Sequence, residues 1–332
     1  MPTEASIETL DGNILGACGR KVFMEKMAIG GRLEKYLPIC TETSSLRMGF
    51  IFSFGKQFEQ VIAELLESAG HTVINNGKFR FPIPDTDLYL SAEFDHIVID
   101  KDSGQAYGLE DKTGNGHSFT MRRVQGYKRP PSTQEKEEYV TDSLKPSPAP
   151  EHLLQGMLYL YAFQTGLVKD LYPYDIDSWR FLYLSRDSME FREFIIKLDK
   201  VGNLHYPILM HVNNFRQIEM VPTIPFTVED IFARYKMIDS YIQSETMPPA
   251  DFKSNLNSYE IAEYHKNGLL SEARKTSMQK GKMEAADWKC RYCKWYPVCQ
   301  ALPRKGFKLT EKIEIPGYND NSVPETEELY NV

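Results

Sequence analysis

Long apolar runs are missing from this sequence of 332 residues. No segment approaches the roughly 18 to 20 apolar residues that a membrane-spanning helix needs, and the first twenty residues contain no long apolar stretch. The composition, with 42% hydrophobic and 26% charged residues, is ordinary for a globular protein. We therefore expect no membrane contact and a cytoplasmic location, or the host cytoplasm if a virus encodes the chain.

Cysteine is also scarce, and a nucleotide-binding loop is absent. The five cysteines are an odd number and three of them are crowded together, which in a reducing compartment favours metal ligation over disulfides. No G-x-x-x-x-G-K-(S/T) occurs, so an ATP-driven motor would be on another chain. The net charge of −7 argues against nucleic-acid binding by bulk charge, although a local basic groove remains compatible with it.

Hydrophobic periodicity predicts a mixed α/β core. Apolar residues at helical spacing predict a helix over 55–70, which Gly70 ends. Short apolar runs predict strands at 78–83, 87–100 and 105–113, and the turn "DKDSG" joins the last two into a hairpin.

The second half of the chain is predicted to be mostly helical. A segment rich in proline, serine and charge, 128–150, predicts a long mobile loop. We expect a helix at 151–166, strands at 178–186 and 190–199, and helices at about 202–219, 227–243 and 257–280. The expected organisation is an N-terminal helical segment (1–50), a core (51–200), a C-terminal helical region (201–305) and an acidic, disordered tail (306–332).

Three ionisable residues are candidates for catalysis. Asp95 lies in the apolar run "AEFDHIVID", and Glu110 and Lys112, two apart in "GLEDKTG", share one face of a strand. A hairpin partner could bring Asp95 beside them. Two carboxylates can hold Mg²⁺ and activate a water, and a lysine can orient or deprotonate that water and offset phosphate charge. The alternative is a surface ion pair on an exposed strand.

This arrangement resembles the PD-(D/E)XK nuclease superfamily, whose β-hairpin carries D…(D/E)xK. The resemblance extends to Q-x-x-x-Y on the following helix, matched by Gln155 and Tyr159, and implies that this pair contacts a DNA strand and positions the lysine. The helix before the strands carries G-x-x-x-(H/E) in the family, matched by "GKQFE" with Glu59. The family's glycine three residues before the aspartate is Ala92 here.

The resemblance implies a restriction-endonuclease-like core and a set of site residues. The implied ligands of Mg²⁺ or Mn²⁺ are Asp95, Glu110, the backbone carbonyl of Asp111, and Glu59. Lys112 would assist the attacking water. The number of metal ions remains open.

Three cysteines form C-x2-C-x5-C in "DWKCRYCKWYPVC": Cys290, Cys293 and Cys299. Such a set suits a zinc site, an iron–sulfur site or a reactive thiol group. No second CxxC and no HxxxH accompanies it, so a fourth ligand must be distant, and Cys18 and Cys40 are the candidates.

One cysteine before the core, closely followed by arginine, and three cysteines after it resemble the iron–sulfur nucleases. This is the layout of the AddB-type (RecB-like) nuclease domain and of the CRISPR-associated Cas-four exonucleases, over about residues 10 to 300. The resemblance implies a [4Fe–4S] cluster on Cys18 and the three C-terminal cysteines, which joins the N- and C-terminal segments. Cys40 would be a packed thiol. Zinc on the same four cysteines is the alternative.

Basic and aromatic residues follow the predicted hairpin in "TMRRVQGYKR". Charges that track phosphates and rings that stack on bases suit a single strand of DNA. The alternative is a solvated loop. The predicted DNA contacts are Arg20, Arg122, Arg123, Tyr127, Lys128 and Arg129.

Together with the resemblance, these features predict a Mg²⁺- or Mn²⁺-dependent DNA exonuclease acting on single strands or DNA ends. The alternative is a non-catalytic or weakly catalytic DNA-binding subunit of a helicase–nuclease or a CRISPR adaptation complex.

Overall fold

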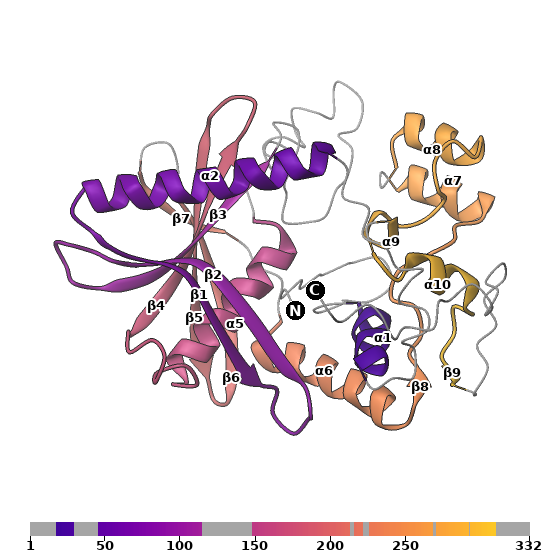
Figure 1. Cartoon of the computed structure of the whole chain (residues 1–332), viewed down its shortest axis with the longest axis horizontal. Helices are drawn as coiled ribbons and strands as arrows, with labels where there is room; N and C mark the ends of the chain where they lie inside the picture. Colours follow the sequence, from indigo (N-terminus) through magenta and orange to yellow (C-terminus); the bar gives the residue numbers. More distant parts are fainter. Residues whose placement is uncertain are drawn as a thin grey trace, which may run out of the picture. The chain divides into compact units, whose positions relative to one another are not determined.

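The computed structural model describes residues 18–29, 46–114, 148–212, 216–221, 226–267, 270–291 and 293–309. The chain divides into two compact units, Met1–Gly16 with Ser44–Lys236 and Ala17–Thr43 with Met237–Val332 (Figure 1). We refer to them as the sheet unit and the cysteine unit. The predicted N-terminal segment 1–50 is thus divided between the two. The predicted loop at 128–150 and the acidic tail lie largely outside the described residues.

The sheet unit is built on seven strands in the order β1-β2-β3-β4-β5-β6-β7. They are β1 (Thr72–Pro82), β2 (Tyr89–Ile99), β3 (Ala106–Gly114), β4 (Ile176–Ser185), β5 (Phe191–Val201), β6 (Leu204–Val212) and β7 (Ile218–Val221). Neighbours are antiparallel except β3 and β4, which are parallel. Parallel neighbours need a crossover, and α5 (Pro150–Gln164) lies on it. The fold is therefore mixed α/β with a mostly antiparallel sheet.

Two helices cover opposite faces of this sheet. Leu109 of β3 packs with Phe58 and Ile62 of α2 (Leu46–Ser68), whereas the next residue, Glu110, bonds to Gln155 of α5. Successive strand residues point to opposite faces, so α2 and α5 lie on different sides. Figure 1 shows α2 running across the strands.

The predicted ends of both helices are confirmed. Gly70 has φ +95° and Gly166 has φ +75°, a left-handed conformation that glycine adopts at little cost. The amides of His71 and Leu167, which follow these glycines, donate back to carbonyls of the last helical turn. The helix predicted at 55–70 begins earlier, at Leu46.

The predicted hairpin turn between β2 and β3 is also confirmed. The Asp100 carboxylate accepts hydrogen bonds of 2.8 Å from both the amide and the hydroxyl of Ser103. Gly104, with φ +69°, completes the reversal.

The predicted helix at 202–219 is wrong, because Leu204–Val212 form β6 and Ile218–Val221 form β7. Val201 pairs with Leu204, and Gly202 between them has φ +63°, so Gly202 and Asn203 make the two-residue turn of a hairpin. Pro207 disfavours a helix interior. It is tolerated in β6 because the described pairing with β7 begins only at Leu209.

The helices predicted after the sheet are confirmed in outline. α6 (Val228–Gln243) matches 227–243, and the Thr227 hydroxyl caps its N-terminus by accepting the Asp230 amide at 3.1 Å. The segment predicted at 257–280 forms two helices, α7 (Ser258–Lys266) and α8 (Glu272–Gln279). None of the helices in the described ranges is long and apolar enough to cross a membrane.

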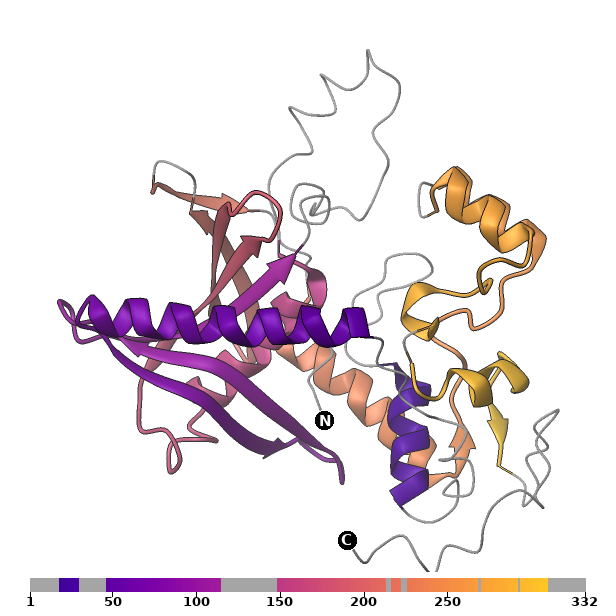
Figure 2. The same cartoon turned by 45° about the horizontal axis from the view of Figure 1, so that its top comes forward.

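The cysteine unit joins segments from both ends of the chain. α1 (Gly19–Ile29) lies beside β8 (Thr246–Met247) and α10 (Tyr296–Ala301) in both views (Figures 1 and 2). The short α9 (Trp288–Arg291) and β9 (Phe307–Lys308), paired with β8, complete it. One apolar cluster spans both ends, with these buried members: Phe23, Met24, Met27, Ala28, Met247, Trp295, Val298 and Leu302.

Gly108→Ala is expected to destabilise the sheet unit. A Cβ at Gly108 would lie 2.2 Å from the ring of Trp179, its fully buried neighbour on β4. Overpacking of this kind costs about 1–3 kcal/mol. Denaturant unfolding should show the loss. Gly114→Ala, on the same strand but with nothing within 4 Å of the new Cβ, is the control, and equal stability of the two variants would contradict the prediction.

Candidate metal and catalytic site

The candidate site lies where β2 and β3 separate. Their antiparallel register ends at the pair His96–Leu109, so the backbone beyond it is free for other partners. The Asp111 amide donates to Asp95 Oδ2 at 2.8 Å. The opposing strand β1 bends here as well, since Asn76, which falls opposite Asp95, has φ +54°. The structure therefore brings Asp95 together with Glu110 and Lys112, as their strand positions predict.

Glu110 is the buried centre of this group, with 2% of the residue exposed. Its Oε1 accepts hydrogen bonds from Lys112 Nζ at 2.7 Å and from Gln155 Nε2 at 2.8 Å. Its Oε2 is buried and has no hydrogen-bond partner among the described residues. Burial raises the pKa of Glu110 to about 7, Lys112 opposes this rise and Asp95 adds to it. An unsatisfied carboxylate oxygen of this kind suits a bound cation.

The other acidic residues of the group are electrostatically coupled to it. Burial raises the pKa of Asp95 to about 6, Lys112 lowers it and Glu59 raises it further. Glu59, half-buried on α2, also has a raised pKa, caused by burial and by the Asp111 carboxylate. The carboxylates from β2, β3 and α2 therefore raise one another's pKa values.

Lys112 is held as an ammonium ion. Its burial acts to lower its pKa, but the Glu110 and Asp95 carboxylates outweigh that effect, and the net shift is upward. A lysine with a raised pKa is a poor base and a strong source of positive charge. In this arrangement it is suited to orienting a water and offsetting phosphate charge, and not to removing a proton.

Gln155 and Tyr159 act on the carboxylate and the backbone. One amide hydrogen of Gln155 goes to Glu110 and another to the Tyr159 hydroxyl at 2.7 Å. That hydroxyl donates to the Glu93 carbonyl at 2.6 Å. Tyr159 is fully buried, so its expected contact with a DNA strand is corrected: it fixes the β2 backbone, and Gln155 orients Glu110 in place of the lysine.

The sequence interpretation overlooked His96. Its ring lies 3.0 Å from Asp111 Oδ2 through Nε2 and 2.6 Å from Asn75 Oδ1 through Nδ1, and the residue is 2% exposed. Both neighbouring atoms are oxygens, an arrangement that favours the doubly protonated, imidazolium form of the ring. Although burial opposes the charge, the bond and charge of Asp111 raise the pKa of His96. The sequence signal that could have identified this residue was a histidine directly after Asp95.

The His96 contact also clarifies the role of Asp111. Its carboxylate is directed to the imidazolium, on the side of the sheet opposite Glu110. Its other oxygen, Oδ1, is buried and has no hydrogen-bond partner among the described residues. The contribution of the Asp111 backbone carbonyl to a metal stays a prediction.

The donor set fits a divalent cation of the Mg²⁺ type. It consists of oxygens from Asp95, Glu110 and Glu59 and the Asp111 carbonyl, all of them hard ligands, with the unsatisfied Oε2 of Glu110 among them. Within the described ranges, however, no three His, Cys, Asp or Glu side chains stand in a ready-made metal-holding group. The fit to a divalent cation therefore depends on the chemistry of these oxygen donors and on the unsatisfied Oε2 of Glu110.

The four predicted cluster cysteines all lie in the cysteine unit, although no three of their thiols stand in a ready-made metal-holding group among the described residues. Cys18, Cys290, Cys293 and Cys299 are free thiols and half-buried. Burial raises the pKa of Cys18, and Asp251, Cys293 and Cys299 raise it further. Burial likewise raises the pKa of Cys290, with Cys18, Cys299 and Cys293 contributing. The Cys18 thiol thus lies close enough to the C-terminal thiols, which follow it by 272 or more positions, for their charges to interact.

The surroundings of these thiols fit a cysteine-bound metal group. The amide of Cys293 donates to the Cys290 carbonyl at 2.9 Å, so the backbone turns between the two. Cys293 and Cys299 pack against the apolar cluster that contains Trp295. The buried side chain of Trp295 therefore belongs to the surroundings of these two thiols. Four thiols without disulfides in a partly apolar site suit an iron–sulfur cluster or zinc.

The predicted DNA contacts receive one correction. Arg20 is 1% exposed, and its guanidinium is bonded to backbone carbonyls of the C-terminal segment. It therefore has no surface from which to reach a phosphate. The remaining predicted contacts, Arg122, Arg123, Tyr127, Lys128 and Arg129, lie outside the described residues.

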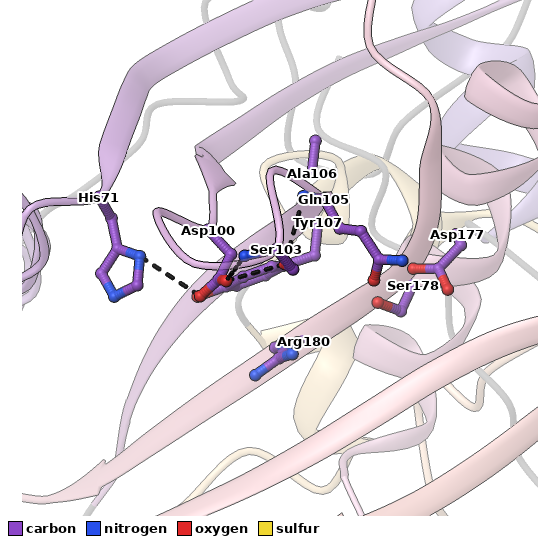
Figure 3. Close-up of a pocket in the computed structure, with 9 residues that line it drawn as sticks. All are labelled: His71, Asp100, Ser103, Gln105, Ala106, Tyr107, Asp177, Ser178 and Arg180. Atoms are coloured by element: carbon purple, nitrogen blue, oxygen red, sulfur yellow. Dashed lines mark hydrogen bonds and ion pairs between the residues drawn. The ribbon is translucent and has the colours of Figure 1, made fainter.

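A polar pocket of about 450 Å³ lies at the closed end of the β2–β3 hairpin (Figure 3). Its charged groups are paired: Arg180 bonds to Glu193 at 3.0 Å and lies over the Tyr107 ring, and His71 lies 3.5 Å from Asp100. The carboxylates of Asp100 and Asp177 make it unsuited to a phosphate. It plays no part in the assignments below.

Comparisons with known proteins assign no family. No protein-family model matches the chain, and no curated protein matches it. A solved structure described as "Crystal structure of SSO0001" is similar at a TM-score of 0.32 and 13% identity, over 77% of this chain and 82% of that chain. A similarity of this degree assigns neither a fold family nor a function to this chain.

Asp95→Asn is expected to stabilise the protein when metal is absent. The pKa of Asp95 is raised to about 6, so its ionised form destabilises the fold above that pH, and the amide oxygen of Asn can still accept the Asp111 amide. With chelator at about pH 7.5, the unfolding free energy should rise by on the order of 1–3 kcal/mol. The gain should shrink as the pH falls from about 6 and vanish only below the ordinary pKa of 3.8, where the carboxyl is protonated in both the folded and the unfolded chain.

Mn²⁺ supplies the second half of this test. It should raise the melting temperature of the wild type and not that of Asp95→Asn, because binding to the native state alone stabilises it. Asp177→Asn is the control for the measurement without metal. Burial raises the pKa of the Asp177 carboxyl, but Lys197 outweighs it and the net shift is downward, so loss of this carboxylate should not raise the unfolding free energy. Equal stabilisation of wild type and Asp95→Asn by Mn²⁺ would refute the assignment.

Proposed function

We propose that this protein is a metal-dependent nuclease of the PD-(D/E)XK class. The observation that carries the proposal is the convergence of Asp95, Glu110 and Lys112 at the opening of β2 and β3, with Gln155 of the following helix on Glu110. Each of these motif positions is a weak signal by itself, but together they occupy one site in the fold. The restriction-endonuclease-like description of the core belongs to the same proposal.

More specifically, we propose an exonuclease with an iron–sulfur cluster that acts on single-stranded DNA or DNA ends. The support for the cofactor is the meeting of Cys18 with the three C-terminal cysteines. The order of the motifs along the chain supports the kind of nuclease. The cluster would join the two ends of the chain and contribute its binding energy to folding.

The catalytic roles follow from the charges of the site. Asp95, Glu110, Glu59 and the Asp111 carbonyl would hold Mg²⁺ or Mn²⁺, which supplies Lewis acidity and lowers the pKa of water. Lys112, as an ammonium ion, orients the attacking water and stabilises negative charge on the phosphate. Gln155 fixes Glu110 for this task. His96 balances the charge of Asp111 from the other face of the sheet.

Lys112→Ala is expected to reduce DNA cleavage by about 10²–10⁴-fold, because it removes the cation beside the reacting phosphate. The measurement is Mg²⁺- or Mn²⁺-dependent digestion of end-labelled single-stranded DNA. Lys197→Ala, which removes an exposed lysine paired with Asp177 on the sheet, should keep wild-type activity. Unchanged cleavage by Lys112→Ala would remove the active-site assignment. No cleavage by the wild type on any DNA would favour the non-catalytic, DNA-binding alternative.

Cys290→Ser is expected to lose iron. The wild type, purified without oxygen, should contain about four irons per chain and absorb broadly near about 400 nm, as [4Fe–4S] proteins do. The variant should contain far less iron and unfold at a lower temperature, because the cluster holds the two ends of the chain together. Cys40→Ser should retain both properties. Zinc in place of iron in the wild type would overturn the cofactor and leave the nuclease proposal standing.

A further inference from the structure

Arg20 follows Cys18, the first candidate cluster ligand, by two residues, and its guanidinium contacts Cys299, the last candidate ligand. It sits in the first turn of α1, and its side chain is almost completely buried. The guanidinium Nη1 lies 3.7 Å from Cys299 Sγ, within hydrogen-bonding range of a sulfur acceptor. The residue therefore connects the N-terminal segment with Cys299 by a direct contact between a cation and a thiol.

The remaining N–H groups of Arg20 fix the direction of this contact. Nε donates to the Pro248 carbonyl at 2.8 Å, and Nη2 donates to the carbonyls of Pro303, Arg304 and Lys305. A guanidinium is planar and holds its donors in a fixed fork. With Nε and Nη2 engaged by backbone oxygens, Nη1 is held toward the sulfur.

The charge of Arg20 is also fixed. A guanidinium carries a positive charge, and its hydrogen-bond partners among the described residues are carbonyl oxygens and a sulfur, which carry no full negative charge. The neighbouring apolar cluster, which includes Trp295 and Val298, lowers the local dielectric constant. In such a setting a nearby cation stabilises a thiolate sulfur more strongly than in water.

We propose that Arg20 is a positioning residue that raises the reduction potential of the iron–sulfur cluster through its hydrogen bond to Cys299. This inference rests on the proposed function for the cofactor alone and not for DNA cleavage. Hydrogen bonds to ligand sulfurs and net charge set the potentials of such clusters. A cluster that gains one electron becomes more negative by one unit, so a fixed N–H donor and positive charge favour the reduced form.

Arg20 thus has two separable effects. Its bonds to backbone carbonyls hold residues 303–305 to α1, which is a contribution to stability. Its bond to Cys299 acts on the electron affinity of the cluster. A stability measurement reports the first effect, whereas only a potential reports the second.

The test is a reductive titration of the full-length, cluster-loaded chain with dithionite as the electron donor, followed by electron paramagnetic resonance. Arg20→Met should shift the midpoint to a more negative potential. Arg304→Gln is the matched control: it removes one positive charge from the same segment, but the Arg304 guanidinium bonds to Glu260 and contacts no described cysteine. Its midpoint should equal that of the wild type.

The outcomes separate the claims. An unchanged midpoint in Arg20→Met, or an equal shift in Arg304→Gln, would overturn the proposal and leave Arg20 a structural residue. If Arg20→Met fails to hold iron, Arg20→Lys decides, because an ammonium cannot reproduce the fork: a more negative midpoint supports the proposal and a wild-type midpoint overturns it. Metal analysis of the wild type tests the cofactor itself. A chain that binds zinc and no iron overturns both the cofactor proposal and this inference, whereas iron with an unchanged midpoint in Arg20→Met overturns this inference alone.

Discussion

The end of the β2–β3 ladder at His96 and Leu109 is the constraint on which the candidate site depends. Had the ladder continued, the Asp111 amide would be committed to β2, and Asp95 would lack the donor that now holds it. Where two strands part, their freed backbone groups must find other partners. Here the Asp95 carboxylate and the Tyr159 hydroxyl take up those roles, so the same separation that opens the sheet also aligns the acidic residues.

Charge balance then explains which side chains surround this opening. Glu110 and Asp111 are buried on opposite faces of β3, and each has its own cation, Lys112 on one side and His96 on the other. The two further acids, Asp95 and Glu59, leave the site with an excess of negative charge that burial makes costly. Buried acidic groups with raised pKa values often mark functional sites, and a divalent cation would relieve this excess.

The sequence was most informative where the physics is local. The glycines that end α2 and α5, and the turn "DKDSG", act within a few residues, and their structures could be predicted. The β6–β7 region was mistaken for a helix because Gly202–Asn203 was not recognised as a hairpin turn. The pairing of His96 with Asp111 depends on the register of two strands, and Tyr159 on the depth of α5 in the core. Neither can be read from spacing alone.

Arg20 shows most clearly how burial changes the meaning of a residue. In the sequence, an arginine beside a cysteine is equally compatible with a phosphate contact and with a structural role. The fold decides, because a buried guanidinium requires acceptors for its donors, and the segment 303–305 supplies carbonyl oxygens at the required distances. With the guanidinium held by those oxygens, Nη1 donates to the sulfur of Cys299. A residue first assigned to the substrate thereby becomes part of the environment of the Cys299 thiol.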